Sequence, residues 1–294
     1  MTCPICGNDA SWPIPSRREP EIGRWRAECG EAGSTDWRLC RRCGNGYPAF
    51  AQDLAVLARI WEANRTSDDP SKADALWAER RRIAVLGGER ALAFYAPLAA
   101  RAKGRFLDIG CGLGGTVRAF ADAGWDALGV DADPATKPSH EALGIASRIG
   151  QVETLDLEGG WDIVHSAHAI YFVTDPMRFL GRARALLKPD GLLAITIADM
   201  MAWDDSTEPA YVHTFFPTGQ SMAYAITLAG FQVVAMRRAK GSVHIAARIG
   251  EAPLPSVSPA MIRLGHLTRP LRYALVGRPM TAVRRLAKTI LRRA

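Results

Sequence analysis

Short apolar runs alternate with amphipathic stretches through the middle of the chain, and this alternation predicts strands separated by helices. Residues 105–109 are mostly apolar and predict a buried strand. A glycine-rich turn follows, and residues 116–123 then place apolar side chains at helical spacing. Gly124 stands where this helix should end. Residues 127–130 are apolar again and predict a second strand.

The same reasoning predicts the rest of a sheet. Further strands are expected at residues 145–149, 162–166, 192–197, 231–236 and 242–249. A helix is expected over 176–187, and the Lys-Pro-Asp-Gly stretch at 188–191 predicts a turn, because proline fixes φ and glycine accepts positive φ. The last two strands are close enough in sequence to form an antiparallel hairpin. We therefore expect an α/β fold whose mostly parallel sheet ends in an antiparallel hairpin.

The chain of 294 residues has room for one large α/β domain and a small unit at each end. Residues 61–102 are rich in alanine, leucine, arginine and glutamate, and they predict amphipathic helices that help to cover the site. The expected units are a cysteine-rich module, a helical connector, the α/β domain and a basic tail, at residues 1–50, 51–103, 104–250 and 251–294.

The net charge of +7 is unevenly distributed. Residues 251–294 contain nine basic residues and one acidic residue, so this tail carries +8 and the rest of the chain −1. An electrostatic partner is therefore expected to contact the tail. No apolar run reaches the ~18 residues of a membrane-spanning helix, and the first residues lack a signal-peptide pattern. A cytoplasmic location is expected, where thiols stay reduced.

The glycine-rich turn carries the most specific chemical signal. Asp108 precedes its glycines, and Asp131 ends the next apolar run. Glycines let the backbone approach a ligand closely, and a carboxylate accepts hydrogen bonds from a vicinal diol. Gly110, Gly112 and Gly115 also fit the dinucleotide fingerprint, but that fingerprint usually has an apolar residue in place of Asp108. The segment instead resembles Asp-x-Gly-x-Gly, the first motif of class I S-adenosylmethionine (SAM) methyltransferases.

The resemblance covers residues 92–248 and implies a Rossmann-like sheet that binds SAM. It implies that Asp131 binds both ribose hydroxyls, and that Gln151, in place of the usual acid, meets the adenine together with the Val152 amide. The implied cofactor-binding residues are Asp108, Gly110, Cys111, Gly112, Gly114, Asp131, Gln151, Val152 and Ser166. A nicotinamide cofactor and a purely structural turn are the alternatives.

Four of the six cysteines form two Cys-x-x-Cys pairs, each followed by a glycine. Two such knuckles surround a zinc ion with four thiolates. The predicted ligands are Cys3, Cys6, Cys40 and Cys43. Cys29 breaks the pattern and is not expected to bind. Four thiolates leave no open coordination position, so the zinc is expected to be structural; a redox dithiol and unpaired cysteines are the alternatives.

Methyl transfer is an in-line displacement that chiefly requires alignment, with a base where the acceptor loses a proton. Ligands of doubly wound sheets bind at the carboxyl ends of the strands, where this sequence places Ser166 and Asp199. Many related bacterial enzymes carry Leu-Glu-His-Val-x-Asp-Pro after the fourth strand. Tyr171 and Phe172 replace Glu and His here, so that histidine's role does not carry over. The predicted catalytic residues are His168, Tyr171 and His213, and a structural role is the alternative for both histidines.

A double-knuckle module before such a domain resembles sugar- and polysaccharide-associated methyltransferases, and also zinc-bearing ribosomal RNA methyltransferases. Arginines and tryptophans gather in the module, where they could hold a nucleotide diphosphate or an RNA loop, or form a solvated basic face. They are Arg17, Arg18, Arg24, Arg26, Arg38, Arg41, Arg42, Trp12, Trp25 and Trp37. The nearly neutral remainder of the chain disfavours RNA.

The last residues of the tail predict a basic amphipathic helix. One helical face carries apolar residues from Met280 to Leu291, and the other carries arginines and Lys288. Such helices lie on anionic membranes, and packing against the domain or a second subunit is the alternative. The predicted function is methyl transfer from SAM to a sugar-containing metabolite or glycan intermediate. An RNA methyltransferase and a non-catalytic SAM-binding protein are the alternatives.

Overall fold

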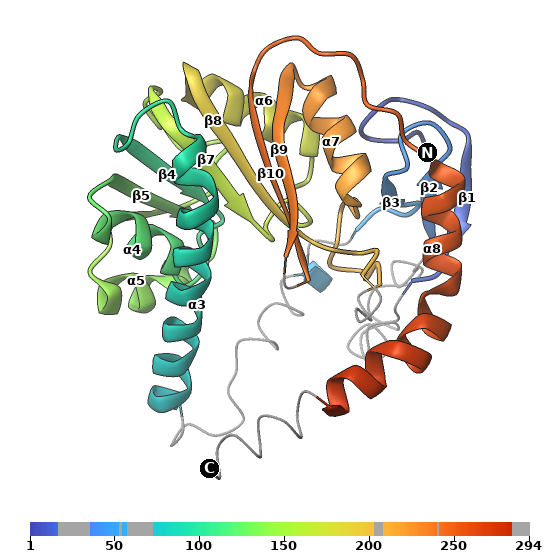
Figure 1. Cartoon of the computed structure of the whole chain (residues 1–294), viewed down its shortest axis with the longest axis horizontal. Helices are drawn as coiled ribbons and strands as arrows, with labels where there is room; N and C mark the ends of the chain where they lie inside the picture. The colour runs from blue at the N-terminus through green and yellow to red at the C-terminus, as the bar shows by residue number, and fades with distance from the viewer. Residues whose placement is uncertain (17–35, 53–54, 58–72, 203–207, 240, 284–294) are drawn as a thin grey trace.

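A seven-stranded sheet with the order β6–β5–β4–β7–β8–β10–β9 forms the centre of the molecule (Figure 1). Its strands are β4 (Arg105–Ile109), β5 (Asp126–Asp131), β6 (Ser147–Ile149), β7 (Trp161–Ala167), β8 (Leu187–Ala198), β9 (Phe231–Ala239) and β10 (Ser242–Ile249). Neighbouring strands are parallel except for β10, which runs antiparallel to both β8 and β9. The expected parallel sheet with a final antiparallel hairpin is confirmed. This computed structural model describes residues 1–16, 36–52, 55–57, 73–202, 208–239 and 241–283.

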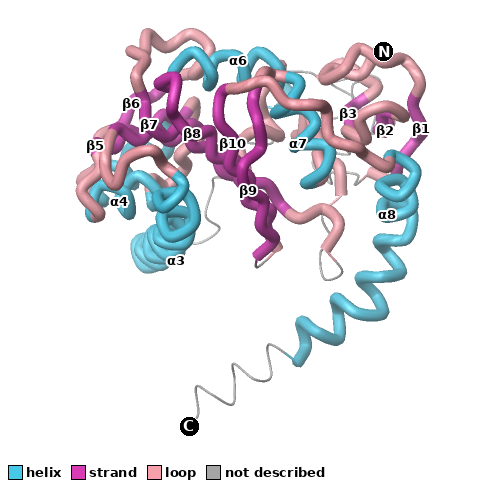
Figure 2. The backbone as a smooth tube through the Cα atoms, turned by 45° about the horizontal axis from the view of Figure 1, so that its top comes forward, coloured by secondary structure: helices cyan, strands magenta, loops and turns pink. Residues whose placement is uncertain are grey.

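Helices cover both faces of the sheet, which explains its consecutive apolar positions. Phe106 and Leu107 of β4 are both fully buried and belong to the cores on opposite faces. Figure 2 shows α3 and α4 on one face and α6 on the other. The helices are α3 (Ala73–Tyr95), α4 (Gly115–Asp122), α5 (Lys137–Leu143), α6 (Pro176–Leu186), α7 (Gly219–Leu228) and α8 (Pro259–Arg272), with short turns η3 (Ala96–Leu98) and η4 (Pro134–Thr136).

A glycine contact between α3 and α4 fixes the helix that begins after the glycine-rich turn. A Cβ at Gly88 would lie 2.5 Å from the Gly115 carbonyl oxygen, and a Cβ at Gly115 would lie 2.2 Å from the Ala84 carbonyl carbon. Only glycine permits this approach at both positions, because those atoms belong to the backbone. The predicted connector therefore holds one long helix that buttresses the start of α4, while its residues 58–72 lie outside the described part.

The cysteine-rich module forms a second, antiparallel sheet of β1 (Ser11–Ile14), β2 (Trp37–Cys40) and β3 (Gly46–Pro48). Gly46 exchanges two backbone hydrogen bonds with Phe216, at 3.0 and 3.1 Å, which joins the module to the segment before α7. Trp37 is fully buried with its ring 6.1 Å from that of Phe216. The prediction that Trp37 helps to hold a nucleotide or RNA is therefore wrong, because its ring belongs to the core.

The turn predicted at residues 188–191 lies within strand β8. Residues 188–191, predicted as a turn, belong to β8, which pairs with β7 at both Leu187 and Leu192. The register shifts between Trp161 and Ile163, so the extra residues of β8 form a bulge rather than ending the strand. Apolar pairing on both sides of the Pro-Asp-Gly stretch outweighs its preference for a free turn.

The tail continues as α8 and a π-helical turn, η5 (Tyr273–Gly277), with helical residues to 283. Arg272 donates hydrogen bonds to the Met201 carbonyl at 3.2 Å and to the Gly265 carbonyl at 2.8 Å, and Arg269 donates to the Met200 carbonyl. These bonds hold α8 on the segment after β8. Most of the predicted tail helix, residues 284–294, lies outside the described part. Among the helices that are described, none is long and apolar enough to cross a membrane.

The buried side chain of His266 should make the stability of the fold depend on pH. Burial, followed by the charges of Arg269 and Arg272, lowers the pKa of His266 from 6.5 to about 3. Between these pH values the unfolded chain binds a proton that the folded chain excludes, so stability falls as pH falls below 6.5. We expect the free energy of unfolding to drop by about 1.4 kcal/mol per pH unit through this residue. Denaturant titrations of wild type and His266→Gln from pH 7 to 4.5 should diverge by that slope. Parallel curves would contradict it.

Candidate functional site

The glycine-rich turn between β4 and α4 forms the centre of the candidate site. Gly110, Gly112 and Gly114 have φ of 72°, 53° and 82°, the left-handed region that favours glycine. A Cβ at Gly110 would lie 2.3 Å from the Ala169 Cβ, so the segment after β7 packs directly against the turn. A Cβ at Gly112 would meet nothing within 4 Å, so its backbone faces open space. The turn therefore offers a close backbone approach to a ligand.

Asp131 is brought to this turn from the end of β5. Its Oδ2 accepts a hydrogen bond from the Gly112 N–H at 2.7 Å, and its Oδ1 accepts from the Asp133 N–H at 2.9 Å. The side chain is half-buried, and each carboxylate oxygen keeps lone pairs for further donors. The structure thus unites the turn and Asp131, as the sequence predicts for a site that binds a diol.

Two side chains of helix α5 contact the backbone of the glycine-rich turn. These contacts were not predicted from the sequence. The Ser139 hydroxyl donates to the Leu113 carbonyl at 2.9 Å, and His140 Nε2 lies 2.7 Å from the Gly112 carbonyl oxygen. That distance makes Nε2 the protonated nitrogen of His140. The Cys111 thiol lies 3.6 Å from the same nitrogen, and burial raises the thiol's pKa, so it stays protonated. Cys111 is a small packed residue of the turn.

Replacing His140 should weaken cofactor binding without unfolding the domain. His140→Ala removes one hydrogen bond to the turn, which contributes about 1 kcal/mol. We expect the Kd for SAM, measured by calorimetry, to rise about three- to tenfold. Glu141→Ala changes an exposed side chain of the same helix and serves as the matched control. Equal Kd values for the two variants would show that the His140 contact does not position the turn.

A buried histidine–aspartate hydrogen bond lies next to the turn. His165 Nδ1 lies 2.7 Å from Asp108 Oδ1, and both side chains are almost fully buried. The two residues occupy paired positions of β4 and β7. Oδ1 of Asp108 is therefore engaged by a histidine from the neighbouring strand. A histidine amid the apolar run 162–166 was the available signal, but its partner depends on strand register.

The three predicted catalytic residues gather after β7, in different environments. His168 is exposed and has φ 55°, and it is the non-glycine residue with positive φ in the described part of the chain. Tyr171 is buried, and its hydroxyl accepts a hydrogen bond from the Ala198 N–H. His213 lies near both, with its ring 5.8 Å from that of Tyr171, and its Nδ1 accepts from the Ala210 N–H at 3.0 Å.

These environments differ in what each residue can do chemically. Desolvation by its neighbours, followed by the charge of His165, lowers the pKa of His168, so its imidazole is neutral at pH 7. A neutral His213 carries its proton on Nε2, because Nδ1 accepts a hydrogen bond. Tyr171 anchors the segment after β7 to the end of β8. Its own carbonyl accepts from the Thr214 N–H at 2.7 Å, which brings the His213 segment beside it.

The remaining predicted residues flank this centre. Gln151 is exposed, and its carbonyl accepts from the Leu155 N–H at 2.9 Å, while Val152 is buried beside it. Ser166 is buried at the end of β7. Asp199 follows β8, and its carboxylate lies 3.6 Å from Arg238. Asp199 is therefore engaged with the hairpin strand β9.

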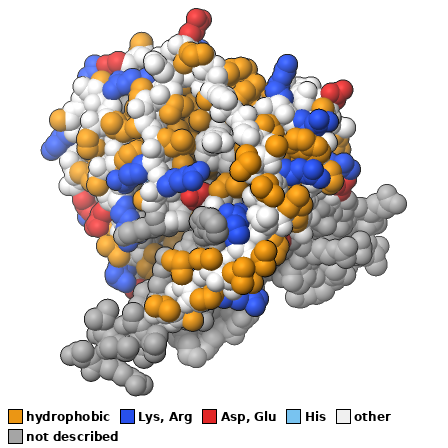
Figure 3. Space-filling model, turned by 45° about the vertical axis from the view of Figure 1, so that its right-hand side comes forward, with side chains coloured by type: hydrophobic (Ala, Val, Ile, Leu, Met, Phe, Trp, Pro, Cys, Tyr) orange, Lys and Arg blue, Asp and Glu red, His pale blue; other side chains and the backbone are white. Residues whose placement is uncertain are grey.

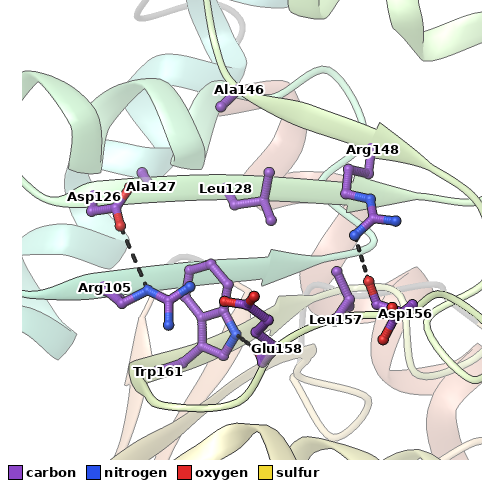
Figure 4. Close-up of a pocket in the computed structure, with 10 residues that line it drawn as sticks. All are labelled: Arg105, Asp126, Ala127, Leu128, Ala146, Arg148, Asp156, Leu157, Glu158 and Trp161. Atoms are coloured by element: carbon purple, nitrogen blue, oxygen red, sulfur yellow. Dashed lines mark hydrogen bonds and ion pairs between the residues drawn. The ribbon is translucent and has the colours of Figure 1, made fainter.

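A cavity of about 430 Å³ lies away from this centre (Figure 4). Its lining includes Arg105, Asp126 and Trp161, which begin β4, β5 and β7, whereas the glycine turn follows the carboxyl end of β4. The Arg105 guanidinium lies 4.2 Å from the Trp161 ring centre and 3.5 Å from Asp126. Because its charged groups are paired with one another, this cavity adds nothing to the candidate site.

The two Cys-x-x-Cys knuckles come together in the N-terminal module. The Sγ atoms of Cys3, Cys6, Cys40 and Cys43 all lie within 4.8 Å of one another. The Cys3–Cys43 and Cys6–Cys40 separations are 3.6 and 3.5 Å. A tetrahedral ion with Zn–S bonds of ~2.3 Å would set its sulphur atoms ~3.8 Å apart. The four predicted ligands therefore lie close enough together to surround one ion, while Cys29 lies outside the described residues.

Backbone and amide groups support the cluster. Gly7 and Gly44 both have φ of 68°, and each N–H donates to the first cysteine carbonyl of its knuckle, at 3.0 and 3.1 Å. The Asn45 amide donates to Cys43 Sγ and to the Ser221 carbonyl, both at 3.3 Å. Asn45 thus links the sulphur cluster to α7. Hydrogen bonds among the neighbouring thiols raise the pKa of Cys3 and lower that of Cys40.

Two described arginines of the predicted basic patch, Arg38 and Arg41, have partners within the protein. Arg38 lies 2.8 Å from Asp36, and the Arg41 guanidinium lies 4.9 Å from the Trp12 ring centre. Arg263 of α8 lies 5.3 Å from the same Trp12 ring. Trp12 therefore helps to seat α8. Arg17, Arg18, Arg24, Arg26 and Trp25 lie outside the described residues.

The sequence is similar to known methyltransferases. The sequence model of the family described as "Methyltransferase domain" matches residues 76–236. A Bradyrhizobium sp. (strain ORS 278) protein named ubiquinone biosynthesis O-methyltransferase is 37% identical over 98 residues, which cover 31% of this chain and 39% of the relative. A protein of the same name from Rhodopseudomonas palustris (strain HaA2) is 36% identical over 97 residues, with 31% and 38% covered. The chain thus spans about two fifths of the length of these curated relatives.

A solved structure from Thermotoga maritima, titled a SAM-dependent methyltransferase and possible histamine N-methyltransferase, is also similar. It is 21% identical, has a TM-score of 0.48, and aligns over 61% of this chain and 95% of its own.

Proposed function

Because the chain belongs to the methyltransferase domain family, we propose that it transfers a methyl group from SAM to a small-molecule acceptor in the cytoplasm. The observation that carries this proposal is the union of the open glycine turn with Asp131, held at 2.7 Å from the Gly112 N–H. The residues fit an adenosyl ligand, because Gly112 leaves open space and Asp131 keeps lone pairs for ribose hydroxyls. Gln151 and Val152 would lie beside the adenine.

Bound SAM would supply an electrophilic methyl group on a sulfonium. The chain's part is to orient the acceptor in line with that methyl group and, where the acceptor carries a proton, to accept it. His168 fits the base, because it is exposed, neutral and next to Ala169, which packs against Gly110. Its left-handed backbone is the kind of strain that clusters at functional sites.

His213 and Tyr171 fit supporting roles. His213 presents a donor at Nε2, so it suits a hydrogen bond to the acceptor better than proton abstraction. Tyr171 is buried and positions the segment that carries His168. Asp108 binds His165 of the neighbouring strand β7. This buried contact helps to hold the ends of β4 and β7 in position next to the glycine-rich turn.

Zinc is the second proposed cofactor. The fit rests on four sulphur atoms within 4.8 Å of one another and on the matched backbone geometry of the two knuckles. Four protein ligands would close the coordination shell, so the ion would stabilise the module and take no part in methyl transfer.

A sugar-containing metabolite or glycan intermediate is the proposed acceptor, on the strength of the double-knuckle module. A second candidate is an oxygen acceptor of the kind indicated by relatives named ubiquinone biosynthesis O-methyltransferase. RNA is disfavoured, because Trp37 is buried, Arg38 pairs with Asp36, and Arg41 lies against Trp12.

Methyl-labelled SAM tests the function directly. Purified protein would be incubated with nucleotide sugars, lipid extract and total RNA from the source organism, with Asp131→Ala as the inactive control. Label in the sugar fraction supports the proposed acceptor, and label in the lipid fraction supports the second candidate. Label in RNA alone overturns the small-molecule acceptor. Tight SAM binding without label in any fraction overturns the catalytic proposal in favour of a non-catalytic SAM-binding protein.

A further inference from the structure

We propose that the outer face of α8 and of the turns after it docks on an anionic membrane surface. The outer face comprises seven side chains, which are Met261, Leu264, Leu267, Leu271, Leu275, Met280 and Val283. The inference goes beyond methyl transfer, and it holds whatever the acceptor is. It also extends the membrane contact from the start of the predicted helix at residues 280–291 back along α8.

Helix α8 has two apolar faces, of which only one is covered. Ile262, Gly265, His266 and Arg269 are buried against the body of the protein. At 100° per residue, Leu264, Leu267 and Leu271 project on the opposite side. A helix packed on its own domain normally carries polar residues there. Instead, these three leucines have 49–61% of their surface exposed.

The exposed apolar surface is concentrated on this segment. The outer face holds seven of the fifteen large apolar side chains that are exposed in the described part of the chain. Their exposed fractions reach 61% at Met261 and Leu271 and 67% at Leu275. Figure 3 shows hydrophobic side chains gathered along this helix, and Figure 2 shows the helix running away from the body of the molecule. A patch of this kind marks an interaction site.

The charge of the segment identifies the partner. From Pro259 to the last residue the sequence has nine basic residues and no acidic one; Arg269 and Arg272 are engaged by backbone carbonyls, and the other seven carry the charge of the segment. Apolar side chains flanked by unbalanced arginines suit the interface of anionic lipid, where the chains enter the acyl boundary and the cations contact headgroups. A second copy of this chain fits poorly, because pairing the outer faces would bring two such basic segments together without acidic partners.

The docking face is rigidly related to the candidate site. Arg269 and Arg272 bind the carbonyls of Met200 and Met201, directly after the carboxyl end of β8. That end of the sheet also carries the glycine turn and His168. A membrane at α8 would therefore lie on the side of the molecule that carries the candidate site.

Vesicle co-sedimentation of the full chain tests this proposal. Vesicles of phosphatidylcholine alone and of a phosphatidylcholine–phosphatidylglycerol mixture would be compared at low and high salt. We expect binding to the anionic vesicles that weakens with salt. Leu267→Glu/Leu271→Glu should lower the partition coefficient at least ~tenfold, because it removes two apolar groups and adds two repelled charges. Leu228→Glu/Val234→Glu, at exposed positions outside α8, should bind as wild type does.

Circular dichroism shows whether each variant is folded. The vesicle assay contains no SAM, so its outcome is independent of whether the chain binds SAM. Should the first double variant unfold, Leu275→Glu/Val283→Glu replaces it, because both side chains are exposed beyond α8. Wild type that stays in the supernatant with anionic vesicles overturns the proposal, as does equal loss of binding in the control variant. A dimer that the Leu267→Glu/Leu271→Glu change converts to monomer, without vesicle binding by wild type, assigns the face to a second copy and overturns it too.

Discussion

Asp131→Ala is expected to raise the Kd for SAM by ~100-fold or more. The carboxylate faces the open backbone at Gly112 and keeps lone pairs for two ribose hydroxyls. A hydrogen bond to a charged group contributes about 1.5–3 kcal/mol, so losing two costs at least ~3 kcal/mol. The substitution also frees the Gly112 N–H, which loosens the turn. Isothermal calorimetry measures the change directly.

Asp126→Ala is the matched control for this prediction. Asp126 begins the same strand, its side chain is 76% exposed, and it contacts Arg105 at the far end of the sheet. Its Kd for SAM should stay within about twofold of wild type, since it loses only a surface ion pair. Should the two alanine variants bind SAM equally well, the ribose is held elsewhere and the assignment of this turn is wrong.

The strands next to the glycine turn were predictable because their signals are local. Strand β4 has the bounds that its apolar pattern predicts, and Gly124, with φ 86°, ends α4 as expected. The sequence also identifies Asp131 and the four cysteines, since each belongs to a motif with fixed spacing. Strand β8 shows the limit of such signals, because pairing with β7 absorbed a stretch whose own chemistry favours a turn.

Contacts between distant segments were not predictable. His140 meets the turn from 28 residues away, and Asn45 links Cys43 to a carbonyl 176 residues further along the chain. His165 faces Asp108 only because β4 and β7 pair in one particular register. Composition placed Trp37 in a basic patch, whereas packing placed it in the core. The sequence thus predicts which groups can do chemistry, while register and packing decide which of them meet.

Loss of the proposed zinc ion should separate catalysis from cofactor binding. Wild-type protein purified without chelator is expected to contain about one zinc per chain, and Cys40→Ser to contain almost none, because three thiolates cannot close a tetrahedral shell. Plasma emission spectrometry measures both. Cys111→Ala is the control, since Cys111 lies in the glycine turn and not in the cluster, and it should keep its zinc. Zinc-free wild type would contradict the assignment.

The expected effect of zinc loss on methyl transfer follows from the contact between the cysteine-rich module and the segment that carries His213. Gly46 pairs with Phe216, whose ring lies 5.6 Å from that of His213. The module therefore braces the acceptor side of the site, while the glycine turn is braced by α3 and α5. Cys40→Ser should lower the rate of methyl transfer at least ~tenfold, because an ion that supplies folding energy no longer holds the His213 segment. Its Kd for SAM should change less than about threefold. Equal losses of SAM binding and transfer would mean that the ion supports the whole fold and not the acceptor side alone.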